Sequence, residues 1–228
     1  MSYHQSPSPY VQGSPSGRSP KPMNPLTCLL LAVPFALIVI VLFSIAIYLV
    51  LTNAKAHERL GMHQPVQARP MKNGWTWYYM PSIGVALACT VPPKPIDFSK
   101  SSVRNRVDVS EYGGYQFRGR HLATRIFAYW MRKSTSTLQA QADYTQRQEM
   151  EFMHGNAKSW QKPVVVAGLP GRMVVVDYKY KGYENITRTA HVRVGNVIYA
   201  FEGTYYKNGS KWAEKAFDYE LRTAHIDP

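Results

Sequence analysis

Residues 185–206 read NITRTAHVRVGNVIYAFEGTYY, and this stretch decides the fold because it specifies a β-hairpin. Gly195-Asn196 is a two-residue turn of the kind that joins adjacent antiparallel strands. Folding the chain about this turn sets large apolar side chains opposite one another, in the pairs Val194 and Val197, Val192 and Tyr199, and Ala190 and Phe201. This face of the hairpin is therefore predicted to belong to the core.

The other face of the hairpin is polar. The same register makes His191 and Glu202 diagonal neighbours, with Arg193 beside them, and Asp177 would join them if its strand lies alongside. A histidine next to a carboxylate can act as an acid/base pair, which is the basis of a hydrolase hypothesis. Cross-strand charged pairs ordinarily have no catalytic role, so a solvated sheet face is the favoured interpretation.

Strands and helices are predicted on the N-terminal side of the hairpin and beyond it. Residues that alternate in polarity, or that are rich in aromatic and β-branched types, predict strands over 83–91, 111–117, 121–131, 162–168 and 171–183. A helix is expected over 136–154, where Ser136 to Gln139 has capping-box spacing. A last helix from Ser210 carries an apolar stripe made of Trp212, Ala213, Ala216, Phe217 and Leu221. This order predicts an α+β fold, an antiparallel β-sheet with helices packed on it.

This layout resembles the PsbP/DcrB-like fold. The resemblance rests on an aromatic opening strand and short turn (75–82), an apolar strand ending in PPKP (85–95), the middle helix, an expected Leu169-Pro170-Gly171 turn, and the KWAEKAF helix after the hairpin. It extends from Trp75 to Ile226. Proteins of this kind are mostly binding or accessory modules, some dock on larger membrane complexes, and they share no catalytic residues. The resemblance therefore implies a non-catalytic module.

An uncharged, mostly apolar run, LTCLLLAVPFALIVIVLFSIAIYLVL, occupies residues 26–51. As a helix it would extend about 39 Å at 1.5 Å per residue, which exceeds the ~30 Å hydrocarbon core of a membrane. A cleaved signal peptide is the alternative, since Ala54-Lys55-Ala56 resembles a cleavage site, but the run is longer than the apolar core of such peptides. We therefore predict one transmembrane helix over residues 26–52.

This helix divides the chain into predicted parts. Residues 1–25 form a Ser/Pro-rich tail that is too poor in large apolar residues to fold. Residues 53–73 are polar, contain Pro65 and Pro70, and are predicted to be a linker. Residues 74–228 are predicted to be the α+β domain.

The orientation of the span is set by its flanks. Arg18 and Lys21 precede the span, while Lys55, Arg59 and Arg69 follow it, so the basic residues are nearly balanced. The tail has nothing to bury, and the folded domain follows the span. We expect a single-pass protein of the cell inner membrane with a cytoplasmic tail and a periplasmic, or otherwise extracytoplasmic, domain.

The chain is strongly basic. It has 27 Lys and Arg against 14 Asp and Glu, a net charge of +13, and +11 of this charge lies after the span. Such an excess favours anionic partners or serves only to keep the surface soluble. Basic and aromatic residues alternate over 115–133, as on nucleic-acid surfaces, and the candidate anion-binding residues are Arg118, Arg120, Arg125, Arg132 and Lys133. Aromatic residues of a strand usually belong to the core, so nucleic-acid binding is the less favoured interpretation.

No cofactor or metal is expected. The seven histidines form no pair at metal-ligand spacing, and neither a P-loop nor a G-x-S-x-G motif occurs. Cys28 lies in the apolar run, and Cys89 lies on the apolar face of its strand. Cys89 is therefore predicted to be a buried structural thiol.

These features together predict a membrane-anchored, extracytoplasmic and non-catalytic binding or accessory module. Its expected partners are the membrane and another membrane protein or envelope component. Two alternatives stay open: a cytoplasm-facing basic domain that binds nucleic acid or anionic lipid, and a hydrolase that uses His191 and Glu202.

Overall fold

The computed structural model describes residues 37–45, 47, 57–58, 65–98, 101–133, 136–153, 156–208 and 210–227. The chain divides into two compact units, residues 1–51 and 52–228. Residues 37–45 of the first unit are helical. Among the described residues, no helix is both long and apolar enough to cross a membrane. The predicted tail (1–25) and most of the predicted span (26–52) lie outside the described residues.

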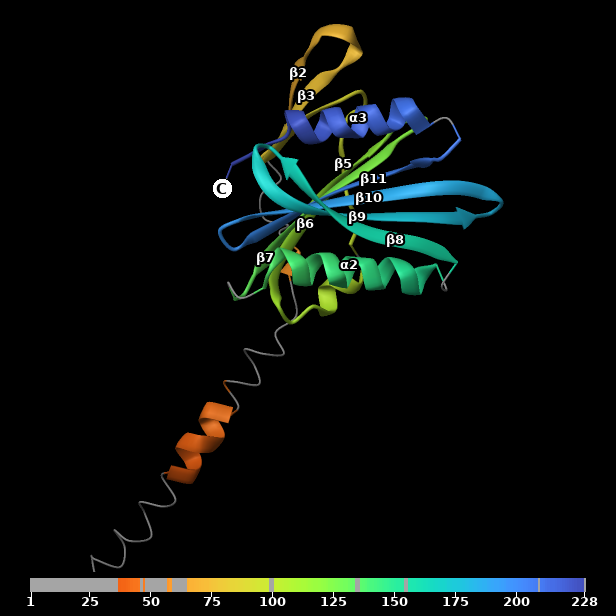
Figure 1. Ribbon diagram of the computed structural model, residues 1–228. Coiled ribbons are helices and arrows are strands. Elements are labelled where there is room, and N and C mark those ends of the chain that lie inside the picture. Colours follow the sequence, from red (N-terminus) through yellow and green to blue (C-terminus); the bar gives the residue numbers. More distant parts are fainter. Residues whose placement is uncertain are drawn as a thin grey trace, which may run out of the picture. The chain divides into compact units, whose positions relative to one another are not determined.

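A large, mainly antiparallel sheet forms the centre of the second unit (Figure 1). Its strands follow the order β1-β6-β7-β11-β10-β9-β8, with β5 also paired to β6. The bounds are β1 His57–Glu58, β5 Lys94–Pro95, β6 Val109–Arg118, β7 Ala123–Met131, β8 Ala157–Val166, β9 Leu169–Tyr180, β10 Tyr183–Val194 and β11 Val197–Tyr206. Strand β1 runs parallel to β6, and the other pairs are antiparallel. The predicted register of the β10–β11 hairpin is confirmed.

A smaller antiparallel sheet has the order β12-β4-β3-β2. Its strands are β2 Gln67–Pro70, β3 Thr76–Met80, β4 Val85–Cys89 and β12 His225–Ile226. All of β4 is buried, as its apolar sequence predicts. Residues 67–70, which the sequence assigned to the linker, pair with β3, so the folded domain begins before residue 74.

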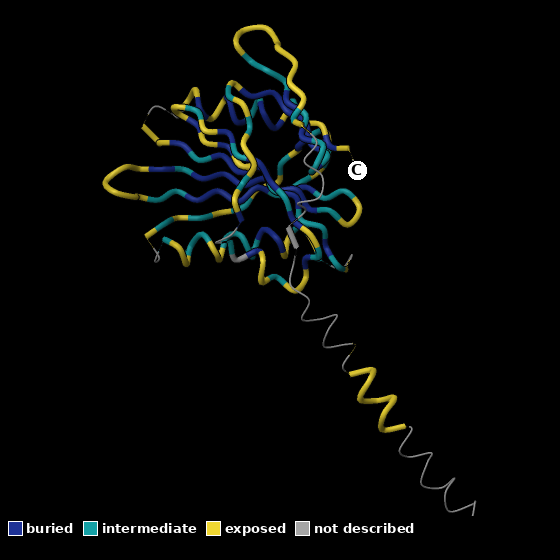
Figure 2. Tube along the Cα trace, turned by 180° about the vertical axis from the view of Figure 1, so that it is seen from behind, coloured by how far each residue is buried: buried dark blue, intermediate teal, exposed yellow. Residues whose placement is uncertain are grey.

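Two long helices lie on opposite sides of the large sheet (Figure 1). Helix α3, Ser210–Thr223, packs against β4, β8 and β11, and helix α2, Leu138–Phe152, packs against β8, β9 and β10. Short 3-10 helices cover Lys72–Gly74 (η1) and Ser102–Asn105 (η2). Buried residues concentrate in the strands of both sheets, as Figure 2 shows. The predicted α+β class is confirmed.

The turn between β8 and β9 differs from the expected one. Val166 pairs with Leu169, so the turn residues are Ala167 and Gly168, both with positive φ (52° and 77°). The expected Leu169-Pro170-Gly171 turn is wrong because these residues already belong to β9. Gly171 is needed there for another reason, since a Cβ would lie 2.5 Å from the carbonyl oxygen of His191.

The apolar stripe of α3 is confirmed except at its first residue. Ala213, Ala216, Phe217 and Leu221 are buried in the main core. Trp212 is 53 % exposed and contacts the ring of His121 instead.

Candidate binding cleft

One face of the large sheet carries a cleft. Helix α2 covers the β8–β10 part of this face, and residues 96–98 and 101–106, together called segment 96–106, pack over β6, β7 and β11 through Phe98 and Val103. Between the helix and this segment lies a cavity of about 440 Å³, lined by residues of β7, β10 and β11 as well. We call it the α2 cleft.

His191 lies on the floor of the α2 cleft, three residues before the end of β10. It is 1 % exposed, and neither ring nitrogen has a hydrogen-bond partner among the described residues. Burial first, and then the positive charge of Arg106, lower its pKa to about 4. The imidazole is therefore neutral at pH 7 and keeps one donor and one acceptor unused.

The expectation that this hairpin face is solvated is wrong. Thr189, His191 and Glu202 are buried because α2 and segment 96–106 cover them. Alternating polar residues are typical of a strand face in water, so the strands alone do not reveal the cover. The sequence of α2 does not predict this cover either, because its buried residues, Gln141 and Ala142, do not form a large apolar stripe.

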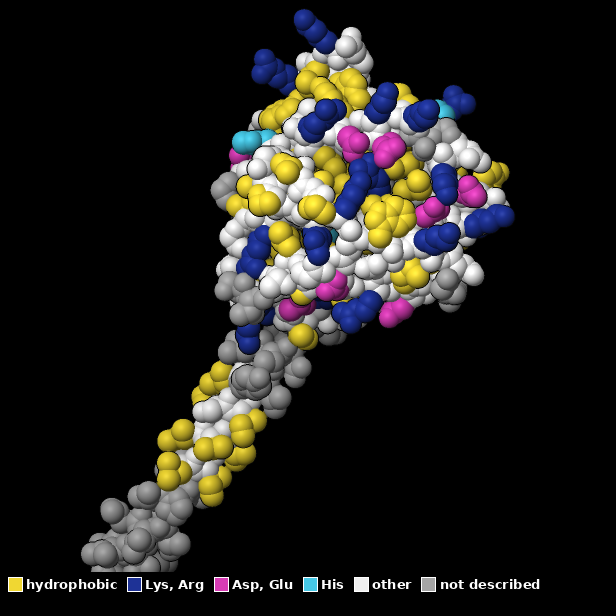
Figure 3. Space-filling model, viewed as in Figure 1, with side chains coloured by type: hydrophobic (Ala, Val, Ile, Leu, Met, Phe, Trp, Pro, Cys, Tyr) yellow, Lys and Arg dark blue, Asp and Glu magenta, His cyan; other side chains and the backbone are white. Residues whose placement is uncertain are grey.

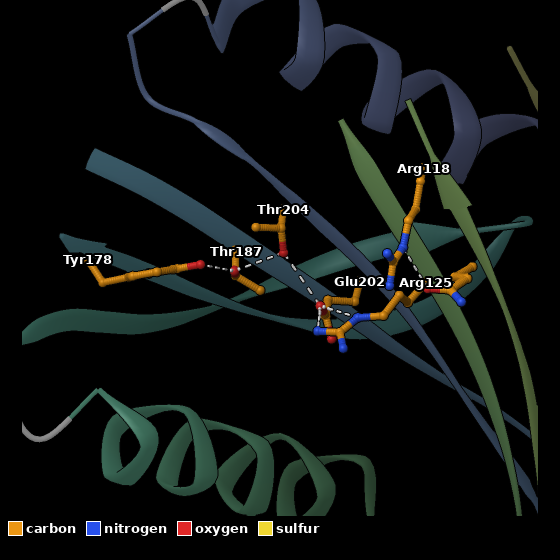
Figure 4. A network of polar contacts seen from close by, with 7 residues as sticks. Arg118, Arg125, Tyr178, Thr187, Glu202 and Thr204 are labelled. Carbon is orange, nitrogen blue, oxygen red and sulfur yellow. Dashed lines mark hydrogen bonds and ion pairs between the residues drawn. The ribbon is translucent and has the colours of Figure 1, made fainter. Parts of the chain in front are cut away.

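Glu202 belongs to a chain of polar side chains that crosses the sheet (Figure 4). Arg125 donates from Nε to Glu202 Oε1 at 2.8 Å, and the two side chains form an ion pair. The hydroxyl of Thr204 lies 3.5 Å from the same oxygen and 3.1 Å from the hydroxyl of Thr187. Tyr178 completes the chain, 3.4 Å from Thr187. Arg125 of β7 and Thr204 of β11 therefore hold the side chain of Glu202 in place.

The acid/base pair of the hydrolase hypothesis is not formed by these contacts. Glu202 is held by Arg125, while His191 has no described partner. A general base also works best when its pKa lies near the working pH, and that of His191 is about 4.

Glu149, which was not predicted from the sequence, lies on the α2 side of the cleft. Its side-chain carboxylate forms no hydrogen bond or ion pair with the described residues, whereas its backbone oxygen accepts a hydrogen bond from the N–H of Met153 at 3.0 Å. Burial, and next the negative charge of Glu202, raise its pKa. A signal was present, because polar residues recur at helical spacing along this face, at Gln141, Thr145 and Glu149.

Arg106 was also missed, and it links segment 96–106 to α2. Its Nε and Nη2 donate to the carboxylate of Asp108 at 3.0 and 2.5 Å, and Nη2 donates to Gln141 Oε1 at 3.0 Å. The guanidinium lies 5.5 Å from the ring centroid of Tyr129 and 4.8 Å from that of Tyr144. Its positive charge is therefore compensated within the protein.

Aromatic rings form the apolar wall of the cleft. Phe127 and Tyr129 are stacked, with ring centroids 6.0 Å apart and an interplanar angle of 11°. Phe98 meets Phe127 edge-on, at 6.2 Å and 66°. The cleft thus combines an aromatic wall with hydrogen-bonding groups on its floor and on α2.

The structure separates two other residues from His191. Asp177 lies in the register five residues along β10 from His191, and Lys207 Nζ is 2.7 Å from its carboxylate. Arg193 shares the face of His191 but donates to backbone carbonyl oxygens at the β10–β11 turn and just before α2. The four polar candidates therefore do not form one site.

The five candidate anion-binding residues are not brought together either. Arg118 and Arg120 lie at the β6–β7 turn, whereas Arg132 and Lys133 follow the other end of β7. The nine residues of β7 separate these pairs by roughly 30 Å at 3.3 Å per residue. Arg125 lies between them and is bound to Glu202. Figure 3 shows Lys and Arg side chains spread over several elements and interspersed with Asp and Glu.

Metal-binding residues do not gather in the part of the chain that the structure describes, where no three His, Cys, Asp or Glu side chains could hold an ion. Cys89 is buried, as predicted, and its thiol donates to Glu220 Oε1 at 3.3 Å.

Comparison with known proteins identifies the fold. No family model matches the sequence, and no curated protein matches it. The solved structure of cyanobacterial PsbP (CyanoP) from Synechocystis sp. PCC 6803 aligns with 74 % of this chain and 99 % of that chain, with a TM-score of 0.50 and 10 % identity.

Two other solved structures align less closely. LpqN, involved in cell envelope biogenesis of Mycobacterium tuberculosis, covers 76 % of this chain and 90 % of that chain, at 7 % identity and a TM-score of 0.39. The immunity protein TplEi of the T6SS from Pseudomonas aeruginosa covers 82 % and 84 %, at 10 % identity and a TM-score of 0.39. At 10 % identity the alignment with cyanobacterial PsbP shows the fold alone, and this chain has a PsbP-like fold.

Proposed function

We propose that this chain is a membrane-anchored binding module of the cell envelope that holds a small ligand in the α2 cleft without transforming it. The observation that carries the proposal is His191, which is buried and neutral on the cleft floor with no described partner. A buried polar group without a partner costs about 1–3 kcal/mol, which a ligand that bonds to it would recover. The volume of about 440 Å³ lies in the usual range for small-molecule sites, about 300–1,000 Å³.

Binding rather than hydrolysis is supported by the state of the two candidate catalytic residues. Glu202 is engaged by Arg125, and His191 has a pKa too low for a base at neutral pH. The membrane anchor and the extracytoplasmic side are supported by the uncharged apolar run over 26–51 and by the low-complexity tail before it, whose only Lys and Arg are Arg18 and Lys21.

Native mass spectrometry of the full chain, purified from its own cells and held in lipid nanodiscs, tests the binding role. Wild-type protein is expected to carry a bound molecule of small mass. Thr145→Trp, which places a large ring on the α2 wall of the cleft, should lose it, and Glu151→Trp, one and a half turns along the same helix and outside the cleft, should keep it. Wild-type protein without a bound mass, or Thr145→Trp protein that retains it, would contradict the proposal.

Thiol labelling of intact cells tests the orientation. Single cysteines at Ser14 and at the exposed Lys211 are introduced in a Cys28→Ser background. Cys89 can stay, because burial, and next the charge of Glu220, raise its pKa to about 12 and keep its thiol unreactive. A membrane-impermeant reagent should label position 211 and leave position 14 unmodified. The reverse pattern would place the domain in the cytoplasm.

A further inference from the structure

We propose that the ligand of the α2 cleft is a small amine, whose ammonium group binds the carboxylate of Glu149 and whose second polar group binds His191. This inference rests on the proposed binding function and names the chemical class of the ligand. Three features of the cleft support it: its charges, its unused hydrogen-bonding groups and its covered aromatic rings.

Both arginines that line the cleft are already paired. Arg106 forms an ion pair with Asp108, and Arg125 forms one with Glu202. The carboxylate of Glu149 has no hydrogen bond or ion pair with the described residues. An anionic ligand would have to displace a carboxylate from an arginine, whereas a cation finds an acceptor that is not in use.

The charges around Glu149 are themselves more negative than positive. After burial, the charge of Glu202 raises the pKa of Glu149 by more than the charge of Arg125 lowers it. Arg125 therefore lies near two carboxylates and compensates only one of them. Asp97 is a third carboxylate of the lining. This side of the cleft attracts a cation and repels an anion.

An ammonium group suits Glu149 better than a neutral group or a metal ion. A neutral ligand would cover the carboxylate without supplying a counter-ion, which is unfavourable. An ammonium group supplies the charge together with N–H donors for the carboxylate oxygens. Among the described residues, no three His, Cys, Asp or Glu side chains are placed to hold a metal ion.

His191 requires a second polar group on the same molecule. Its neutral imidazole offers one donor and one acceptor, and neither has a partner among the described residues. A hydroxyl group or a second amine would bond to it, whereas a hydrocarbon chain would leave it buried and unpaired. The ligand is thus polar at two points, one facing α2 and one facing β10.

The aromatic wall does not offer a free ring face at Phe127. Tyr129 is stacked on this ring, with centroids 6.0 Å apart, and the guanidinium of Arg125 lies 5.8 Å from its centroid. Arg106 lies in the same way near the rings of Tyr129 and Tyr144. A flat ligand ring is therefore not expected to stack here, and amines with an aliphatic skeleton are the appropriate probes.

Saturation-transfer NMR near neutral pH, on the full chain in phosphatidylcholine nanodiscs, tests this assignment. The amine probes are spermidine, cadaverine and aminopentanol with its two polar groups at opposite ends of the chain. Pentanediol replaces the amine of aminopentanol by a neutral hydroxyl group, and hydroxypentanoate replaces it by a carboxylate. We expect transfer to at least one amine and none to these two analogues.

Two carboxylates of α2 provide a matched pair of variants. Glu149→Gln keeps the size of the side chain and removes its charge, so affinity for the amine should fall by roughly tenfold or more. Glu151→Gln makes the same change at an exposed residue outside the cleft and should leave the affinity unchanged. Since the carboxylate of Glu149 has no described partner to lose, Glu149→Gln should unfold at no lower a temperature than wild type.

The contact with His191 is tested by a change in the protein and a change in the probe. His191→Phe keeps a planar ring and loses both nitrogens, so it should weaken the binding of aminopentanol. Pentylamine, which lacks the hydroxyl group, should bind wild type and His191→Phe about equally. An equal loss for both amines would overturn this contact.

The amine assignment is overturned if no amine shows transfer, if pentanediol or hydroxypentanoate binds as strongly as the amines, or if wild type and Glu149→Gln bind equally. The adduct seen by native mass spectrometry separates this failure from that of the binding function. Released from the protein, the adduct should react with dansyl chloride, which labels primary and secondary amines. An adduct without a reactive amine would leave the binding function standing and refute the amine assignment. If no adduct is present, both proposals fail.

Discussion

Glu220 of α3 is a buried carboxyl group outside the α2 cleft. It is 3 % exposed, and its carboxylate accepts hydrogen bonds from Thr124 Oγ1 at 2.7 Å and from Cys89 Sγ at 3.3 Å. Burial raises its pKa from 4.5 to about 7, in spite of these two bonds. The group is therefore partly protonated at neutral pH, and its charge state affects the stability of the fold.

The wild-type protein should lose stability as the pH rises from about 4.5 to 7, because Glu220 ionises, and we predict that the Glu220→Gln variant does not show this loss. Because the folded-state pKa lies above the unfolded value, the folded state binds more protons between about pH 4.5 and 7 and loses stability as the pH rises through this window. The loss amounts to about 3 kcal/mol at 1.36 kcal/mol per pKa unit. Urea unfolding at pH 5 and pH 8 measures it, with the exposed Glu184→Gln as control. An unchanged difference between the two pH values in Glu220→Gln would contradict the assignment.

Among the elements, α3 and β11 approach each other closely because of a glycine. A Cβ on Gly203 would lie 2.6 Å from Cδ2 of Phe217, whose ring is fully buried. A ring in such a core has little room to move. Gly203 is thus needed for the contact between helix and strand, and not for an unusual backbone angle.

Gly203→Ala is expected to destabilise the protein by about 1–3 kcal/mol, the usual effect of overpacking. Phe217→Leu should reduce this cost in the double variant, because the smaller side chain makes room for the methyl group. Thermal unfolding of the wild type, the two single variants and the double variant measures the coupling. Strictly additive changes would show that the methyl group and the ring do not compete for space.

The two long helices differ in how they are attached to the sheet. Helix α3 buries Ala213, Ala216, Phe217, Glu220 and Leu221. Helix α2 buries Gln141 and Ala142, and amide contacts such as Gln146 Nε2 to Ser159 Oγ (2.7 Å) and Gln161 Nε2 to Asp143 Oδ1 (2.8 Å) hold it on β8. Few apolar contacts make α2 the more easily released element.

Native-state hydrogen exchange is expected to show this difference. Amides in the middle of α2 should exchange through local opening, with protection factors at least tenfold below those of α3. The same experiment with the cleft occupied should raise the protection of α2, because a ligand would bridge the helix and the sheet. Equal protection of the two helices would mean that α2 opens only on global unfolding.

In the whole molecule, His191 and Glu220 act on opposite faces of the large sheet with opposite pH dependences. The folded-state pKa of His191, about 4, lies below its ordinary value of 6.5, so the folded state binds fewer protons and gains stability as the pH rises from 4 to 6.5. Glu220 loses stability between 4.5 and about 7. The two effects should largely cancel between pH 4.5 and 6.5.

We therefore predict that each single variant shows the pH dependence of the group that remains, which the other group masks in the wild type. Stability of Glu220→Gln should rise with pH across the shared window relative to wild type, that of His191→Gln should fall, and the double variant should keep only the smaller fall that Glu149 contributes, because burial raises the pKa of that carboxyl as well. The sites share no contact, so their effects should add. Urea unfolding at half-unit steps of pH measures the slopes, and slopes of the same sign in both single variants would contradict the assignment.

The predictable parts of the fold are those set by local rules. The two-residue turn at Gly195-Asn196 and the period-2 alternation around it determined the register of β10 and β11, which the structure confirms. The start of α3 and most of its buried stripe followed from the helical period in the same way. The β8–β9 turn was misplaced because a Leu-Pro-Gly sequence fits both a turn and an edge-proximal strand, and pairing with β10 decided between them.

The candidate site was only half predictable. The sequence singled out His191 and Glu202 as diagonal neighbours, and both do line the α2 cleft. It did not single out Glu149 or Arg106, because each reaches the cleft from an element whose position depends on contacts distant in the sequence.

By itself, the sequence determined the α+β class, the hairpin register, the buried thiol of Cys89 and most of the apolar stripe with which α3 packs on the sheet, since each depends on spacing within one or two adjacent segments. Only the tertiary structure decided that the polar face of the hairpin is enclosed and that β2 belongs to the domain. It also decided that Glu202 binds Arg125 and not His191. These features arise from pairings between segments far apart along the chain. An alternating polar pattern is the same in water and under a helix, so no local rule distinguishes a solvated strand face from the floor of a cleft.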